Sequence, residues 1–165
     1  MFAHRKSRGV KAANFHENLT VEILWTIVPA LILIVMAVPA TTALLKVYDT
    51  ENPDIDIKVT GYQWKWQYEY IGEDVKFMSE LRTSQDEQYG REPKGEHYLR
   101  EVTQPLVIPT NKKVRFLITG NDVIHSWWVP DFAVKRDAIP GLFTAAWAKT
   151  DQPGTYVGAC TELCG

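Results

Sequence analysis

The sequence predicts a membrane-anchored all-β protein, in which one transmembrane helix precedes a β-sandwich. Two observations support this class: an uncharged apolar run covers residues 23–45, and short β-prone runs separated by Pro, Gly and Asn follow it. The 165 residues are 45% hydrophobic and 23% charged, which is typical of a folded chain. The formal net charge of -2 provides no basic field, so nucleic acid is not expected as a partner.

The apolar run over residues 23–45 would extend roughly 34 Å as a helix, enough to cross a hydrocarbon core of about 30 Å. A buried helix of a soluble protein is one alternative, but such a helix usually keeps a polar face. A signal peptide is another, but it is shorter and ends in small residues. Pro29 and Pro39 are tolerated in a membrane, where packed neighbours satisfy the freed carbonyls. We therefore expect this run to meet a lipid bilayer.

The two flanks of the apolar run differ in charge, with Arg5, Lys6, Arg8 and Lys11 before it and Asp49, Glu51, Asp54 and Asp56 after it. The positive-inside rule then predicts a cytoplasmic basic segment over residues 1–22, a transmembrane helix over 23–45 and an extracytoplasmic domain over 46–165. The outer domain is net acidic and would steer a basic partner toward it. Glu22 precedes the run by one residue, where a carboxylate at a helix start is favourable, with Asn18 or Thr20 as the cap.

Seven runs are predicted as strands: Ile55–Thr60, Trp64–Tyr70, Leu106–Pro109, Val114–Thr119, Ser126–Pro130, Phe143–Ala148 and Thr155–Gly158. Val114, Phe116 and Ile118 alternate with more polar positions and predict a wholly apolar face. Strands this short and this regularly spaced are typical of a sandwich or barrel. The polar stretch from Ser79 to Gly95 is predicted to be an exposed loop without chemistry of its own.

Both cysteines, Cys160 and Cys164, lie in the last six residues, which indicates a site rather than a disulfide framework. Their spacing leaves three interpretations open: a local disulfide, a zinc site, or a copper site for electron transfer. Zinc usually requires further ligands, whereas thiolates with an imidazole suit copper. His125, between two aromatic-rich runs, is the candidate imidazole, although a lone histidine is more often structural. The remaining histidines lie in polar surroundings and are given no role: His4, His16 and His97.

Four segments resemble subunit II of the haem–copper cytochrome c oxidases: EILWTIVPALIL, GYQWKWQYEY, NDVIHSWWVPDFAVKRDAIPG and PGTYVGACTELCG. With the runs between them they cover nearly all of residues 17–165. The resemblance implies a cupredoxin-like Greek-key sandwich behind a membrane helix. It also implies an electron-transfer subunit of a proton-pumping terminal oxidase, which accepts electrons from cytochrome c and passes them to haem in subunit I. Such a subunit belongs to an enzyme but is not catalytic alone.

The resemblance also implies a binuclear copper centre. In it, Cys160 and Cys164 match the two bridging thiolates and His125 matches one terminal imidazole. Glu162 matches a residue whose backbone carbonyl binds one copper. The side chain of Glu162 would additionally reach a magnesium ion at the border with subunit I.

Further positions carry roles by resemblance alone. Trp64 matches the indole at which cytochrome c delivers its electron, although its period-two stripe with Trp66, Tyr68 and Tyr70 also permits a core position. The other matches are docking carboxylates (Glu69, Asp74 and Asp122), a position facing the catalytic subunit (Asp137) and the mouth of a proton channel (Glu22). The segment HSWWVP and the basic flank favour a bacterial inner membrane over a mitochondrial one.

The sequence departs from the family pattern at both ends. The family normally has an earlier membrane helix, and it carries a His and a Met just beyond the second cysteine, so we expect a partial chain. Among rival functions, quinol oxidase subunits lack the cysteines, and nitrous oxide reductase does not fit a leading membrane helix with Glu22. A further alternative is a membrane-tethered interaction domain with a Cys160–Cys164 disulfide and no metal.

Overall fold

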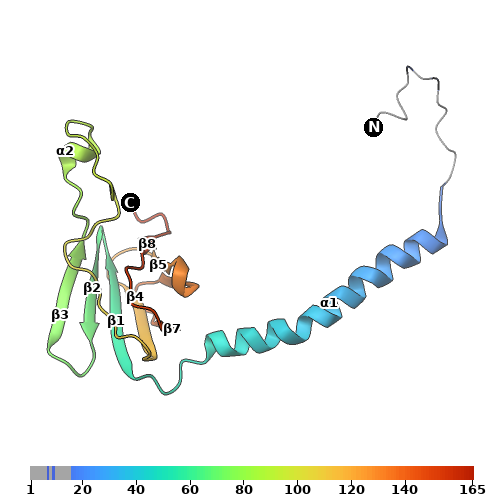
Figure 1. Ribbon diagram of the computed structural model, residues 1–165, viewed down its shortest axis with the longest axis horizontal. Helices are drawn as coiled ribbons and strands as arrows, with labels where there is room; N and C mark the ends of the chain where they lie inside the picture. Colours follow the sequence, from blue (N-terminus) through green and yellow to red (C-terminus); the bar gives the residue numbers. More distant parts are fainter. Residues whose placement is uncertain (1–6, 8, 10–15) are drawn as a thin grey trace. The chain divides into compact units, whose positions relative to one another are not determined.

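The computed structural model describes Ser7, Gly9 and residues 16–165 (Figure 1). The chain divides into two compact units, Met1–Lys46 and Val47–Gly165. The cations of the basic flank, Arg5, Lys6, Arg8 and Lys11, lie outside the described residues. The cytoplasmic position of residues 1–22 therefore remains a prediction.

Helix α1 spans Leu19–Tyr48 and contains the predicted apolar run. It begins before that run because Asn18 caps it: the Asn18 side-chain oxygen accepts a hydrogen bond of 3.2 Å from the Val21 amide. The Glu22 carboxylate in turn accepts from the Asn18 amide, also at 3.2 Å. No residue of α1 is buried, and the helix is long and apolar enough to cross a membrane.

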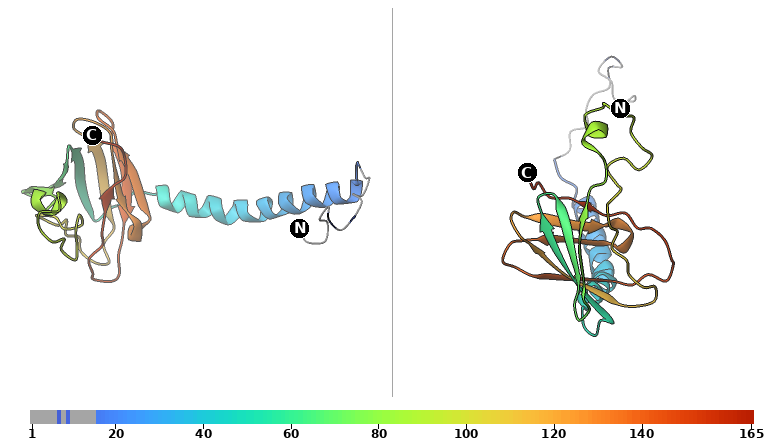
Figure 2. Two further views of the ribbon diagram at one scale, coloured as in Figure 1. Left: turned by 90° about the horizontal axis from the view of Figure 1, so that it is seen from above. Right: turned by 90° about the vertical axis from the view of Figure 1, so that its left-hand side faces the viewer.

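The second unit contains two β-sheets that enclose one core (Figure 2). The larger sheet has the order β3-β2-β1-β4-β7, with β1 and β4 parallel and the other pairs antiparallel. Its strands are β1 (Ile55–Tyr62), β2 (Lys65–Tyr70), β3 (Val75–Glu80), β4 (Val114–Gly120) and β7 (Thr144–Ala148). The smaller sheet has the order β6-β5-β8, formed by β5 (His125–Val129), β6 (Val134–Ala138) and β8 (Ala159–Cys160). Helix α2 (Gln85–Gln88) and a 3-10 turn, Pro130–Phe132, complete the unit.

The core lies between the two sheets. Val114, Phe116 and Ile118 of β4 are fully buried, which confirms the apolar face predicted from their alternation. From the smaller sheet, the Trp127 ring packs on Phe116 with a centroid separation of 4.7 Å. This contact joins the sheets directly beside the start of β5, where His125 lies. The predicted class, a helix followed by a sandwich, is confirmed.

Two predicted strands were wrong. Leu106–Pro109 belongs to no strand, although Leu106 and Ile108 still pack against the core. The backbone of this segment is hydrogen-bonded by a side chain instead of a strand, since the Tyr70 hydroxyl donates to the Val107 carbonyl. Thr155–Gly158 is also not a strand, and the ladder begins only at Ala159 of β8, opposite Trp128.

Three strands, β3, β6 and β8, were missed, and the stretch Ser79–Gly95 is not simply a loop. Strand β6 buries only Val134 and Ala138, with three charged residues between them, so its apolar signal is weak. Ser79 is a buried residue of β3. Helix α2 is held by a capping box in which the Ser84 hydroxyl accepts from the Glu87 amide at 3.1 Å.

Candidate metal centre

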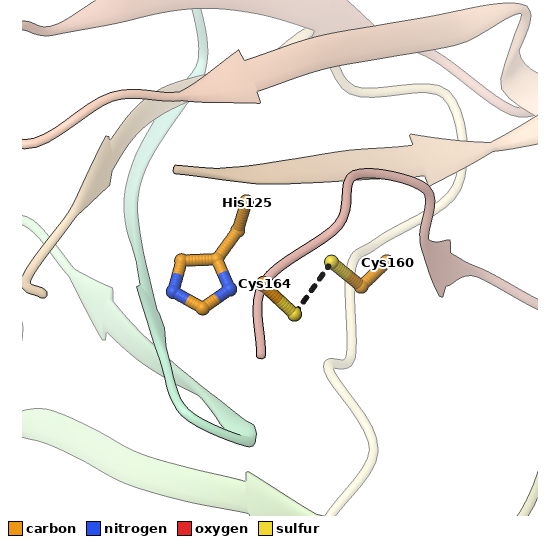
Figure 3. A group of neighbouring side chains, drawn as sticks. All are labelled: His125, Cys160 and Cys164. Atoms are coloured by element: carbon orange, nitrogen blue, oxygen red, sulfur yellow. Dashed lines mark hydrogen bonds between the residues drawn. The ribbon is translucent and has the colours of Figure 1, made fainter. Parts of the chain in front are cut away.

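Three side chains from distant parts of the chain meet at one end of the sandwich (Figure 3). His125 begins β5, Cys160 ends β8, and Cys164 lies four residues further along the chain. Pairing of β5 with β8 puts Cys160 opposite Trp127, and the Thr161 amide extends the ladder by donating to the Ser126 carbonyl at 3.1 Å. The ligand atoms of the three side chains all lie within 4.8 Å of one another. No other such group is found in the part of the chain that the structure describes.

The two thiols are free and close together. Their sulfurs are 3.8 Å apart, which is a contact rather than a disulfide bond. The Cys160 thiol also donates to the Glu162 carbonyl at 3.7 Å, so that this carbonyl faces the Cys160 sulfur. Burial, together with the neighbouring Cys160 thiol, raises the pKa of Cys164. Without a cation beside it, the Cys164 thiol therefore holds its proton.

Asp122 anchors the imidazole. Its Oδ1 lies 2.7 Å from Nε2 of His125 and also accepts from the Val123 amide at 2.7 Å. Its Oδ2 accepts from the Gln63 amide at 2.8 Å. Burial alone would raise the pKa of Asp122, but the hydrogen bonds from His125 and the two amides outweigh it and lower the pKa to about 2. Asp122 is thus a fixed anion beneath the imidazole.

This anion determines which ring nitrogen of His125 is available. With Nε2–H donating to Asp122, the lone pair is on Nδ1, and Nδ1 is on the side of the two sulfurs (Figure 3). The His125 ring is 2% exposed and lies against Gly61, where an added Cβ would be 2.7 Å from Cδ2 of the ring. Trp66 contacts the ring edge-on, with a centroid separation of 5.8 Å. The imidazole is therefore held by a carboxylate, a glycine and an indole.

Gln63 connects the turn between β1 and β2 to both parts of the site. Its amide donates to Asp122, as described above, and its side-chain Nε2 donates to the Cys164 carbonyl at 2.9 Å. The adjacent Trp64 is 68% exposed, so the core alternative for Trp64 is excluded. Tyr68, in the same stripe, is buried. An exposed indole therefore lies next in sequence to a residue that contacts the cysteine loop.

The other predicted site residues are spread over the unit. Glu69 pairs with Lys76 at 3.1 Å, and Asp74 is exposed in the turn before β3. Glu69 is five strand positions from Trp64, about 17 Å along the chain, whereas Asp122 contacts the turn that carries Trp64. Asp137 is exposed on β6. Of the predicted docking carboxylates, the structure thus brings only Asp122 next to the candidate metal centre.

Sequence reasoning identified the three converging side chains but missed Gly61, Gln63 and the contact between Asp122 and His125. The Asp122 contact carried a usable signal, because a carboxylate three residues before a candidate ligand histidine can reach its ring. The contacts of Gly61 and Gln63 carried none, since each joins residues about 60 or 100 positions apart. The donor set, two soft thiols with one oriented imidazole and a carbonyl, suits a metal such as copper or zinc and does not suit magnesium.

These features define a class: a β-sandwich protein with a preceding apolar helix and a candidate thiol–imidazole metal site. The family model described as "Cytochrome C oxidase subunit II, periplasmic domain" matches residues 55–165, and the one described as its transmembrane domain matches residues 1–42. The chain belongs to the cytochrome c oxidase subunit II family. The resemblance inferred from sequence motifs is thereby confirmed.

The relatives with similar sequences include bacterial proteins. A probable cytochrome c oxidase subunit 2 of Rickettsia prowazekii is 42% identical over 154 residues, covering 93% of this chain and 48% of the relative. The cytochrome c oxidase subunit 2 of Cereibacter sphaeroides is 37% identical over 175 residues, covering 98% of this chain and 57% of the relative. The chain therefore spans about half the length of the curated relatives it matches.

The similar solved structures include two at 39% identity. The periplasmic domain of subunit II (CoxB) of Bradyrhizobium japonicum has a TM-score of 0.60, covering 69% of this chain and 76% of the solved one. A mixed disulfide intermediate between a thioredoxin-like protein and subunit II of cytochrome c oxidase has a TM-score of 0.56, covering 72% of this chain and 77% of the solved one. The sandwich is thus that of a subunit II periplasmic domain.

Proposed function

We propose that this chain is the electron-transfer subunit of a proton-pumping terminal oxidase, in which cytochrome c delivers electrons to a binuclear copper centre and haem in subunit I receives them. The observation that carries the proposal is the convergence of Cys160, Cys164 and His125, with Asp122 fixing the imidazole. The chain would act within the oxidase, an oxidoreductase, and would not be catalytic alone.

The residues present fit copper. Cys160 and Cys164 would supply the bridging thiolates, His125 one imidazole through Nδ1, and Glu162 its backbone carbonyl, which already faces the Cys160 sulfur. A copper pair held here would supply a one-electron redox centre whose geometry changes little between oxidation states. The chain's own contribution is preorganisation, because Asp122 orients His125 and Gln63 holds the Cys164 carbonyl before metal arrives.

Electron entry is proposed at Trp64. An exposed indole can make a desolvated contact with a partner, and the net acidic outer domain would steer a basic haem protein toward it. The Gln63 side chain, which donates to the Cys164 carbonyl, would then provide a short route for the electron from this turn to the cysteine loop. Asp122 would support docking next to Trp64, while Glu69 and Asp74 would act at a greater distance.

The remaining roles concern the complex. The Glu162 side chain is proposed as a magnesium ligand at the border with subunit I, which Asp137 would also face. Glu22 is proposed at the mouth of a proton channel, although its contact with the Asn18 amide equally supports a helix-start role. The proposed placement is a bacterial inner membrane, with residues 1–22 cytoplasmic, 23–45 in the bilayer and 46–165 periplasmic.

A second candidate state is a Cys160–Cys164 disulfide without metal. The 3.8 Å separation of the sulfurs favours it, because a small movement of the loop would close the bond. One solved relative is, by its title, a mixed disulfide with a thioredoxin-like protein. We propose that a thioredoxin-like reductant likewise keeps the thiols of this chain reduced for copper.

Copper titration followed by visible spectroscopy tests the proposal. The described residues bring one imidazole to the two thiols, so residues 1–165 alone should not give the purple absorption of a binuclear centre. A chain extended with the His and Met that the family carries beyond the second cysteine should give it. Failure of the extended chain after thiol reduction, or purple absorption from residues 1–165, would contradict this account.

A further inference from the structure

A cavity lies at the open seam of the sandwich, and neither Cys160 nor Cys164 lines it. It has a volume of about 420 Å³ and lies between β6 and β7. These are the edge strands of the two sheets, so within the described part of the chain their outer sides have no strand partner. The Arg136 side chain closes one end of the seam by donating to the Ala145 carbonyl at 3.4 Å. The cavity is large enough for the headgroup of one lipid.

Chain connectivity puts this cavity near the bilayer surface. Val47 lines it and follows the predicted transmembrane run by two residues, about 3 Å along a helix. Trp147, also a lining residue, donates its indole N–H to the Val47 carbonyl at 3.1 Å. Indole rings are enriched at the level of lipid headgroups. If residues 23–45 fill the hydrocarbon core, a cavity lined by Val47 therefore lies at headgroup depth.

The cavity carries charges of both signs. Three cations line it, Lys135, Arg136 and Lys149, together with two carboxylates, Asp131 and Asp151. None of the five forms an ion pair with another side chain among the described residues. Arg136 lies over the Tyr48 ring at 5.1 Å, which fixes the guanidinium at the cavity. The polar groups are thus available for a ligand that has both a negative and a positive charge.

We propose that this cavity binds a phospholipid headgroup of the phosphoethanolamine type. Arg136 and Lys149, with Lys135, would hold the phosphate, because a guanidinium binds two phosphate oxygens at once. Asp131 and Asp151 would accept hydrogen bonds from the primary ammonium. A choline headgroup has no N–H to donate, and a glycerol headgroup lacks the positive charge. Apolar Val47 and Phe132 would contact the glycerol end of the lipid.

This inference depends on the proposed membrane anchoring, and the experiment separates the two. The full chain is reconstituted into nanodiscs that contain equal parts of phosphatidylethanolamine, phosphatidylcholine and phosphatidylglycerol, and retained lipid is identified by native mass spectrometry. Alkaline carbonate extraction of the same sample tests the anchor. We expect phosphatidylethanolamine to be retained about tenfold over either other lipid, roughly the effect of one charge-assisted hydrogen bond.

Two variants locate the retained lipid. Arg136→Gln with Lys149→Gln should reduce retention of phosphatidylethanolamine about tenfold. The matched control, Arg82→Gln with Lys94→Gln, removes the same charges from outside the cavity and should change nothing. Asp131→Asn with Asp151→Asn should abolish the preference over both phosphatidylcholine and phosphatidylglycerol, because both preferences depend on the ammonium that these carboxylates would bind.

Equal retention of all three lipids by an anchored chain would overturn the proposal, as would a preference for phosphatidylglycerol. The proposal would also be overturned if the control variant lost as much phosphatidylethanolamine as the cavity variant. It would equally be overturned if inorganic phosphate competed for the cavity as effectively as O-phosphoethanolamine.

Discussion

The carboxylate of Asp122 lies 2.7 Å from Nε2 of His125 and leaves Nδ1 facing the two cysteine sulfurs. The same carboxylate holds the amide of Gln63, whose side chain binds the Cys164 carbonyl. One anion thus connects the imidazole, the turn that carries Trp64 and the cysteine loop. The geometry of the candidate copper site is set by a residue that supplies no atom to the metal.

Removing this anion should weaken copper binding. We expect Asp122→Ala to lower copper affinity about 10- to 100-fold, because the imidazole loses the partner that fixes its orientation and tautomer. Competition with a chelator of known affinity measures the change in the extended chain. Asp74→Ala is the control, since Asp74 is an exposed carboxylate away from the site. Equal effects of the two changes would show that Asp122 acts only through net charge.

The space under the imidazole gives an independent test. In Gly61→Ala the new Cβ would lie 2.7 Å from Cδ2 of His125, so the ring or strand β1 must move. We expect a loss of stability of about 1–3 kcal/mol and weaker copper binding, measured by denaturant unfolding and chelator competition. Gly95→Ala, where the nearest atom is 3.5 Å away, should be silent in both measurements. Copper affinity unchanged by Gly61→Ala would mean that the ring position is not critical.

Trp64 should matter for electron entry and little for stability. In an assembled oxidase, Trp64→Ala should slow electron transfer from cytochrome c by at least about tenfold, because an aromatic contact at a docking centre contributes strongly to binding. The copper spectrum should be unchanged, since the indole is 68% exposed. Tyr89→Ala, which removes an exposed ring at the end of helix α2, is the control. Stopped-flow transfer at the normal rate in Trp64→Ala would exclude the proposed entry point.

Glu22 tests the proton-channel proposal. In the complete enzyme, Glu22→Ala should reduce turnover several-fold while the copper spectrum is retained. The neighbouring Glu17→Ala removes a carboxylate that precedes the helix cap and should not reduce turnover. Oxygen consumption under saturating reductant measures both. Normal turnover of Glu22→Ala would leave only its hydrogen bond to the Asn18 amide as its role.

Tyr68 predicts how stability depends on alkaline pH. Burial raises the pKa of Tyr68 from 10 to about 12 in the folded state, despite the hydrogen bond from Trp127. Because the folded pKa is above the unfolded one, the corresponding stability is fully present below pH 10. About 2–3 kcal/mol should be lost as the pH rises from 10 to 12.

Tyr68→Phe should destabilise the fold by about 1–3 kcal/mol at neutral pH, because the buried Trp127 N–H loses its acceptor. The same substitution should also reduce the loss of folding stability between pH 10 and pH 12. Urea unfolding at a series of pH values measures both effects, with the exposed Tyr89→Phe as the control. An unchanged alkaline slope in Tyr68→Phe would contradict the role of Tyr68.

The sequence predicted an element correctly where the signal for it lay within the element itself. The apolar helix and the alternating face of β4 depend on burial patterns within one element, and both were predicted. Strand β6 was missed because three charged residues lie between its two buried positions, Val134 and Ala138. Leu106–Pro109 was predicted as a strand because it is apolar. Its apolar residues do pack on the core, but they do so without pairing to a neighbouring strand.

The sequence by itself determined which groups can bind metal: two thiols four residues apart and one histidine in an aromatic setting. It also determined the apolar helix and the polar flanks. Only the tertiary structure decided that Asp122 orients His125, that Gln63 binds the Cys164 carbonyl and that Gly61 leaves room for the ring. The physical reason is that residue chemistry and local periodicity are properties of short segments. Contacts between residues 60 or 100 positions apart depend instead on strand pairing and register, which one added Cβ or one shifted residue would change.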